Sequence, residues 1–435
     1  MKYRMYLRWL FFTLFSAVAA HAQQPDSLAL EQVVQRVLEN NPLIEQSIHK
    51  IDAAQAQINL SKSTTYPFAA AEVSYDRIGP VPEINLPDAG SFSLFPEDNY
   101  DAHVAMQYTV YDYGKRKKQT ALAENGMERA QQSTQAIRNN LAYRTVQVFY
   151  SILFLQQNIN VLDEEISALR SHLNVAQKRA DTGSATPFDV LTTRVRVSNA
   201  ENQRVEIVNV LQKQKLLLKS LMGLEDDQVL QVKGDFTALP IANPEKNSLV
   251  TNALDARPEM KLATNSVNHF ALATQLAALG NKAQIKVNGV LGIKNGYIPN
   301  LNDPKVNWVA GIGLHLPLFD GHATQFKQEQ AQAERAAAES YRNEVQRRIT
   351  TEVSQAVEDV VTQKKKLAAA DLQLEQANEA VSLANKQYDA GVVTNLELLD
   401  AQTVQAQSKL LKSKVLYNLV LSEYQLERAS GLKNW

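Results

Sequence analysis

The chain has 435 residues, enough for about two to four average domains and a large buried core. Its 45 basic and 46 acidic side chains give a formal net charge of −1, which argues against a nucleic-acid-binding protein that works through bulk positive charge. No cysteine is present, which excludes disulfides, thiol catalysis, cysteine-ligated zinc and lipidation of a leader cysteine. With only 16 Gly and 14 Pro, long elements with few breaks are expected.

The N-terminus has the pattern of a secretory signal peptide. Three basic residues among the first eight precede an apolar run over residues 10–20, and Ala20-His21-Ala22 forms a small-x-small cleavage pattern. The run is shorter than the roughly 20 residues that a membrane-spanning helix needs. We therefore expect cleavage of residues 1–22 on export, a mature net charge of −1 − 3 = −4, and no transmembrane helix.

An internal repeat indicates the architecture. Residues 176–191 and 384–399 share a lysine, an aspartate, a glycine, a threonine and a leucine at an offset of 208. Motifs nearer the start of each half match at offsets of 216 and then 207, so the first half contains an insertion of about nine residues. We expect a first repeat over residues 23–227, a linker over 228–247 and a second repeat over 248–435.

Each half contains two short runs in which apolar and polar residues alternate. The apolar positions include Val104, Met106 and Tyr108 in the first half and Ile312 and Leu314 in the second. Each run is about ten residues long, the span of a tilted membrane strand, although a half-buried strand of a soluble sheet shows the same alternation. The expected β-hairpins cover about residues 68–112 and 285–318, with turn-rich loops at 79–99 and 296–305.

Two unusually long helix-forming stretches follow the hairpins, over residues 115–180 and 322–390. At 1.5 Å per residue, each would form a rod of roughly 100 Å. Both stretches are rich in Ala, Gln, Glu and Lys and lack a strict heptad of large apolar residues, which favours sideways packing into a wall of helices. Each rod ends near a glycine, and a return helix is expected over residues 187–222 and 395–430.

This order of elements, duplicated behind a signal peptide, resembles the TolC-type outer-membrane efflux protein family. The most specific strings are the stretch 388–402, its first-half counterpart 181–191, and the strand-to-helix passage 316–321. The resemblance implies a mainly α fold with a β-barrel part. In it, a homotrimer builds an outer-membrane barrel from four strands per chain, continued by a long periplasmic α-helical barrel.

The function implied by the resemblance is a passive outer-membrane duct of a tripartite efflux or type I secretion system. Its partners would be a periplasmic adaptor, an inner-membrane pump and outer-membrane lipid, and a large part of the chain would lie in the periplasm. No enzyme motif, metal site or cofactor site is evident, and nucleic acid is not expected as a partner. A periplasmic helical scaffold or adaptor without a membrane barrel is the alternative. The transported substrate, whether a drug, a metal ion or a polypeptide, stays open.

Four residues are candidates for a gate at the lower end of the helices. Glu397 and Asp400 are three apart and share one helix face, and the resemblance implies that they form acidic rings in the tunnel. Alternatively, they are first-turn acids that stabilise the start of a helix. Tyr388 and Asp189 occupy positions that the family joins in a latch, and Val393 stands where the family has an arginine.

The turns that join the long helices to the return helices are the candidate docking surface for the adaptor. Their residues are small or weakly polar, and the glycines also suit the end of a helix. Arg179 and Lys386 lie near these turns and could replace the missing arginine of the latch. The docking candidates are Gly183, Ser184, Ala185 and Thr186 in the first half and Gly391, Val392, Val393 and Thr394 in the second.

Overall fold

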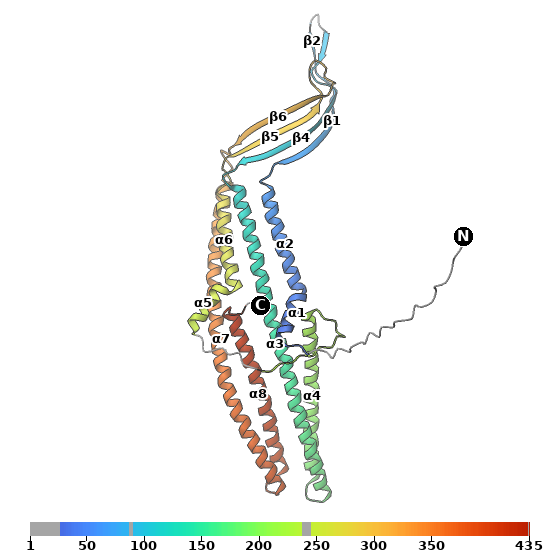
Figure 1. The fold of residues 1–435 in the computed structure, drawn as a ribbon, viewed down its shortest axis with the longest axis vertical. Coiled ribbons are helices and arrows are strands. Elements are labelled where there is room, and N and C mark those ends of the chain that lie inside the picture. Colours follow the sequence, from blue (N-terminus) through green and yellow to red (C-terminus); the bar gives the residue numbers. More distant parts are fainter. Residues whose placement is uncertain (1–26, 87–89, 237–244, 434) are drawn as a thin grey trace, which may run out of the picture.

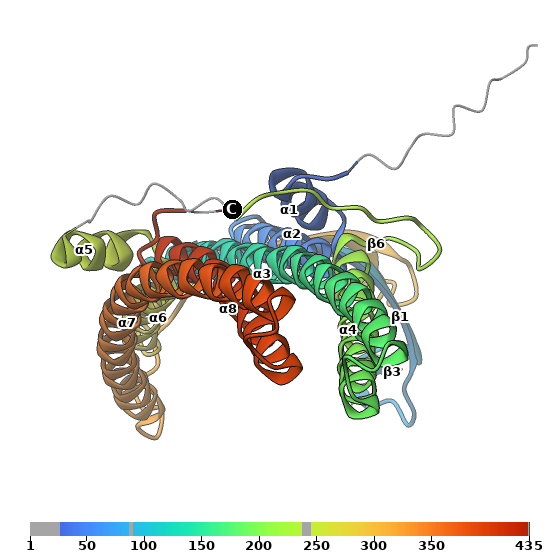
Figure 2. The same ribbon diagram turned by 90° about the horizontal axis from the view of Figure 1, so that it is seen from below.

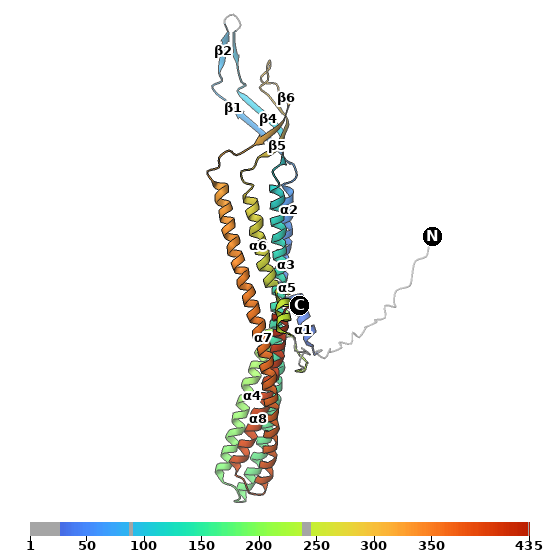
Figure 3. The same ribbon diagram turned by 90° about the vertical axis from the view of Figure 1, so that its left-hand side faces the viewer.

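A computed structural model describes residues 27–86, 90–236, 245–433 and 435 of the chain. The molecule is elongated, with a β-sheet at one end and a layer of long helices that extends away from it (Figures 1 and 3). The expected signal peptide over residues 1–22 and part of the expected linker lie outside the described residues.

The helices confirm the predicted long rods and return helices. The two longest, α3 and α7, have 67 residues each and end within two residues of the predicted positions. The helices of the first half are α1 Leu30–Asn40, α2 Pro42–Ser63, α3 Lys115–Asp181 and α4 Pro187–Met222. Those of the second half are α5 Lys246–Ala256, α6 Pro258–Ala277, α7 Ala323–Asp389 and α8 Asn395–Ala429.

Seen from below, the long helices lie side by side in one curved row, with α1 and α5 on its convex side (Figure 2). In the lower half of the molecule the row runs α4, α3, α8, α7, and in the upper half it runs α2, α3, α6, α7. The largest apolar core lies where α1 packs on α3 and α4, around Val37, Phe149 and Met222. A smaller core joins α5 to α7 around Ile349.

The four main strands form one antiparallel sheet in the order β1-β4-β5-β6. The pairing of β4 with β5 joins the two halves of the chain, and β1 and β6 are the edges. The predicted loop after β1 also contains a two-stranded hairpin, which sequence alternation did not reveal. The strands are β1 Phe68–Arg77, β2 Glu83–Leu86, β3 Gly90–Ser93, β4 Asp98–Tyr111, β5 Gln284–Lys294 and β6 Lys305–His315.

The register separates the sheet into an apolar and a polar face. Val104 lies opposite Leu291, which lies opposite Trp308, and all three side chains are more than half exposed in the single chain. On the other face, Asp101 lies opposite Lys294. Such a wide exposed apolar face marks a surface that another apolar phase covers. Among the described helices, none combines the length and the apolar sequence needed to cross a membrane.

The connections from the hairpins to the long helices α3 and α7 have the same backbone conformation. Two consecutive residues adopt left-handed conformations, Tyr113 and Gly114 before α3 and Gly321 and His322 before α7. An aspartate just before each pair then caps the helix through its carboxylate, which accepts one backbone N–H of the first turn, at 3.1 Å for α3 and 3.0 Å for α7. The sharp turn sets the direction in which each helix leaves its strand.

A charge on the apolar face should impair assembly. Ile312 is 75% exposed in the single chain, and Ile312→Lys should destabilise a lipid-facing strand by about 2–4 kcal/mol near the bilayer midplane. Gly313 lies on the polar face with open space around it, so Gly313→Lys is the matched control. We expect a smaller yield of heat-labile trimer from outer-membrane fractions for Ile312→Lys only. Equal yields for both variants would contradict the assignment of the faces.

Candidate functional site at the helix tips

The two turns at the lower end of the molecule repeat one structure. Gly183 and Gly391 have φ angles of 76° and 72°, and each ends a long helix in a left-handed conformation. Thr186 and Thr394 are the N-caps of the return helices, and their hydroxyls accept the backbone N–H of the third helical residue. The two tips are therefore turns built by local contacts.

The candidate gate residue Glu397 takes part in this local structure. Its carboxylate accepts the backbone N–H of Thr394 at 2.6 Å and the hydroxyl of Thr394 at 2.9 Å. These two hydrogen bonds hold the pKa of Glu397 below its ordinary value. Asp189 makes the same capping box with Thr186. Of the two interpretations from the sequence, these contacts favour the helix-start role for Glu397.

The other acidic candidate, Asp400, forms an ion pair with a residue of a different helix. Arg196 of α4 donates through Nη2 to Asp400 Oδ1 at 2.7 Å, and through Nη1 to Thr403 Oγ1 at 2.7 Å. The guanidinium thus binds two side chains one turn apart on α8. Sequence analysis did not select Arg196, because nothing in its own neighbourhood shows that the two return helices approach there.

Tyr388 is buried against a pair of basic side chains. Its ring lies 4.4 Å from the guanidinium carbon of Arg179 and 5.2 Å from the ring centre of His172. Arg179 also donates to the carbonyl of Tyr388 at 3.2 Å and to Asp389 Oδ1 at 3.4 Å. The candidate Arg179 therefore does contact the second tip. Within one chain the Tyr388 ring packs on Arg179 and His172, and the Asp189 carboxylate binds Thr186, so the latch between Tyr388 and Asp189 stays a prediction.

A buried polar cluster joins all four long helices just above the tips. The amide oxygen of Asn395 on α8 lies 2.6 Å from His172 Nε2 on α3, and its Nδ2 donates to the Asp189 carbonyl and to Thr193 Oγ1 on α4, both at 3.4 Å. Tyr388 of α7 packs on the same histidine. His172, Thr193 and Asn395 are all less than 9% exposed. The only sign of this cluster in the sequence is that the second repeat has a polar residue, Asn395, at the position where the first repeat has Pro187.

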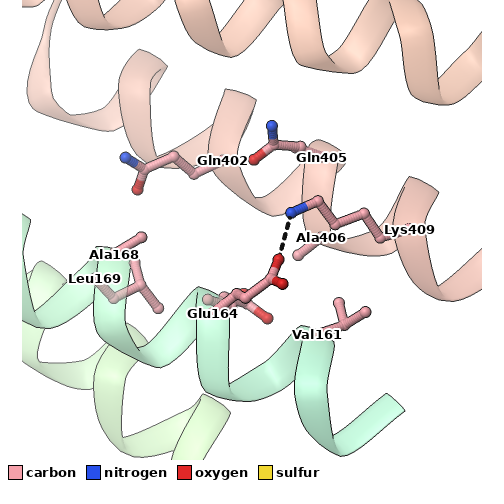
Figure 4. A pocket seen from close by; sticks show the side chains of 9 residues that line it. Val161, Glu164, Ala168, Leu169, Gln402, Gln405, Ala406 and Lys409 are labelled. Atoms are coloured by element: carbon pink, nitrogen blue, oxygen red, sulfur yellow. Dashed lines mark hydrogen bonds and ion pairs between the residues drawn. The ribbon is translucent and has the colours of Figure 1, made fainter. Parts of the chain in front are cut away.

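Higher up, a small cavity of about 110 Å³ lies in the seam between α3 and α8, where the two halves meet (Figure 4). Lys409 of α8 donates to Glu164 of α3 at 2.7 Å across it. Burial raises the pKa of the neighbouring Glu165, and the positive charge of Arg196 opposes that shift. The seam thus holds several charged groups between the two halves. Among the described residues, no group of three histidines or acids is placed to hold a metal ion.

The long helices form an extended curved layer below a sheet that has one apolar and one polar face. This arrangement is that of one side of a membrane duct. The sequence model of the family described as "Outer membrane efflux protein" matches residues 33–224 and 249–432, so the chain belongs to that family. The two matched segments correspond to the two halves of the internal repeat. The protein is therefore an outer-membrane channel of the efflux and secretion type, with a large helical part in the periplasm.

Curated relatives cover most of the chain at low identity. The chain is 24% identical to the alkaline protease secretion protein AprF of Pseudomonas aeruginosa, over 96% of this chain and 87% of the relative. It is 23% identical to the cobalt-zinc-cadmium resistance protein CzcC of Cupriavidus metallidurans, over 73% of this chain and 74% of the relative. The match to the outer membrane efflux protein family sets aside the alternative of a periplasmic scaffold or adaptor without a barrel.

Solved structures share the fold. The outer-membrane protein VceC of Vibrio cholerae has a TM-score of 0.79 at 17% identity, with 92% of this chain and 96% of that chain covered. The outer-membrane channel OprN also has a TM-score of 0.79, at 18% identity, with 92% and 89% covered. The TolC-like fold expected from the sequence is thus confirmed.

Removing the central amide of the buried cluster should destabilise the tips. Asn395→Ala would leave the buried Nε2 of His172 without its hydrogen-bond partner, which costs about 1–3 kcal/mol, whereas Thr193 would keep its hydrogen bond to the Asp189 carbonyl. We expect a lower midpoint for the thermal loss of helical circular dichroism in the purified protein. Ser184→Ala, at an exposed position of the neighbouring turn, should stay within about 0.5 kcal/mol. A midpoint for Asn395→Ala equal to that of Ser184→Ala would contradict a tying role for the cluster.

Proposed function

We propose that the chain works as a homotrimer that closes one barrel from three four-stranded sheets. The supporting observation is that the sheet has an apolar outer face and two free edges, β1 and β6. Free edges cannot remain in lipid, since no water is there to bind their N–H and C=O groups. The ends of the lower helix row also carry exposed apolar residues, including Leu191 on α4 and Leu372 on α7. Three copies joined edge to edge would cover both.

In this assembly the protein is a passive duct from the periplasm to the exterior. Energy and substrate selection would come from an inner-membrane pump, linked to the duct by a periplasmic adaptor. The relatives named above support such partners, since their names refer to protease secretion and to metal resistance. Those substrates belong to the relatives. Because they differ so much from one another, they do not identify the substrate of this chain.

The lower end of the duct would be closed by contacts between the helix pairs. Arg196 holds α8 to α4 through Asp400, and Arg179 holds α3 to Tyr388 of α7. Both contacts cross between the two halves, and opening the lower end would separate them. In this scheme Asp189 and Glu397 stabilise the return helices, so among the four candidates Asp400 and Tyr388 carry the gate.

Breaking the Arg196 contact should open the closed channel. We expect Arg196→Ala and Asp400→Asn each to raise the single-channel conductance of the reconstituted protein several-fold in planar bilayers. Glu397→Gln is the control, because glutamine at this position preserves the capping box and should leave conductance unchanged. A wild-type protein that neither forms trimers nor conducts would refute the duct itself. Conducting wild-type channels with unchanged conductance in both variants would refute only this gate.

The adaptor would dock on the exposed tip turns, Gly183 to Thr186 and Gly391 to Thr394. Val392 is 73% exposed there, so its side chain is free for a partner. We expect Val392→Asp to reduce efflux in whole cells while trimer and surface levels stay normal. Substitutions of Gly391 are less informative, since its positive φ strains any other residue. Normal efflux with Val392→Asp would place the docking surface elsewhere.

A further inference from the structure

The seam between α3 and α8 contains two polar groups that lack hydrogen-bond partners among the described residues. Both line the cavity of about 110 Å³ shown in Figure 4, which we call the seam cavity. Gln402 Oε1 of α8 is buried, and no described residue donates a hydrogen bond to it. The carboxyl of Glu165 on α3 is half-buried, and no described residue forms a hydrogen bond with it. An amide oxygen only accepts hydrogen bonds, whereas a carboxyl donates one when it is protonated, so the protonated form of Glu165 complements Gln402.

The charged groups that α3, α4 and α8 direct toward this part of the seam are paired with one another. The pairs are Asp163 with Arg204, Arg170 with Glu201, Glu164 with Lys409, and Arg196 with Asp400. Burial disfavours the charge of Glu165 more strongly than Arg196 favours it, so the pKa of Glu165 is raised above its ordinary value. Neighbouring copies of the proposed trimer would join at α4 and α7, the ends of the lower row, and would add no charge to this cavity.

Opening of the duct would change the surroundings of Glu165. In the proposed function the lower end opens when the two halves part, and α3 and α8 are the helices that meet at their boundary. Water would then reach the carboxyl, and the pKa of Glu165 would return toward its ordinary value. Protonation of Glu165 therefore stabilises the closed seam. This contribution is complete below the ordinary pKa of a glutamate and is lost as the pH rises through the raised pKa of the closed seam.

We propose that Glu165 and Gln402 form a proton-dependent lock between the two halves of the chain, which we call the seam lock. When Glu165 is protonated, its hydroxyl donates to Gln402 Oε1, directly or through water, for which the cavity has room for about three molecules. When Glu165 is ionised, Gln402 Oε1 has no donor and an unpaired charge remains in the seam, so the halves part more readily. The seam lock rests on the proposed duct, whose lower end it would hold closed at acid pH and release at neutral pH.

Parting of the seam can be measured with one introduced thiol, because the chain has no cysteine. Ala406 lines the seam cavity and is 7% exposed, so the thiol of Ala406→Cys should react with 4,4′-dithiodipyridine chiefly when the seam parts. Rates are compared between variants of the purified protein at one pH, since thiol reactivity itself depends on pH. At about pH 8, Glu165→Gln should slow the reaction about threefold or more, and at about pH 4 the two rates should agree. Gln402→Met should speed the reaction at about pH 4, because the protonated carboxyl loses its acceptor.

The matched control is Glu164→Gln, the same substitution one residue away, which removes a bond to Lys409 across the seam and should not slow the reaction. Equal rates for Glu165 and Glu165→Gln at about pH 8 would overturn the seam lock. A faster reaction with Glu165→Gln would also overturn it, because the ionised carboxylate would then be holding the seam through the Gln402 amide. Conductance is recorded on the same preparation. A conducting protein without the rate difference refutes only the seam lock, and a rate difference in a protein that does not conduct refutes only the duct.

Discussion

Hydrogen bonding of the backbone in a medium without water is the constraint on which the rest of this structure depends. The sheet offers an apolar face to lipid, and every unpaired N–H or C=O group there costs several kcal/mol. Four strands with two open edges can satisfy this condition only as part of a closed barrel. The helices α3 and α7 leave their strands through left-handed turns, and the long helices form the arc seen in Figure 2.

The two halves of the chain have the same backbone geometry at corresponding helix junctions, but different side chains stabilise those junctions. In the first half, Asn41 caps α2 and its amide donates to the carbonyl of Leu221 at the end of α4. At the matching position of the second half, Arg257 is 6% exposed and binds Glu259 and Glu352. One junction is therefore held by neutral hydrogen bonds and the other by a buried arginine that binds two partly exposed carboxylates. The repeat preserves backbone geometry, and the side chains that secure it differ.

Features that depend on local sequence could be predicted, and features that depend on helix register could not. A lack of breakers predicted α3 and α7, and strict alternation predicted β4 and β6. The contacts of Arg196 with Asp400 and of His172 with Asn395 join residues more than 200 positions apart. No pattern within one helix encodes them. The contacts of Glu397, by contrast, could be predicted from its local sequence. The resemblance suggested a gate residue, but the capping motif that Glu397 forms with Thr394 accounts for the hydrogen bonds of its carboxylate.

The pairing of β4 with β5 has a consequence for the order in which the chain can fold. These strands are separated by α3, α4, α5 and α6, so the sheet cannot form until the second half has been exported. The α3–α4 hairpin, by contrast, needs only neighbouring sequence, and contacts between near neighbours form fastest. Until then the first half can form only its helical hairpin and the β1–β4 pair, and the edge of β4 that will bind β5 stays open. During that interval the strands are exposed to aggregation, and a holding chaperone would be of most use to this chain then.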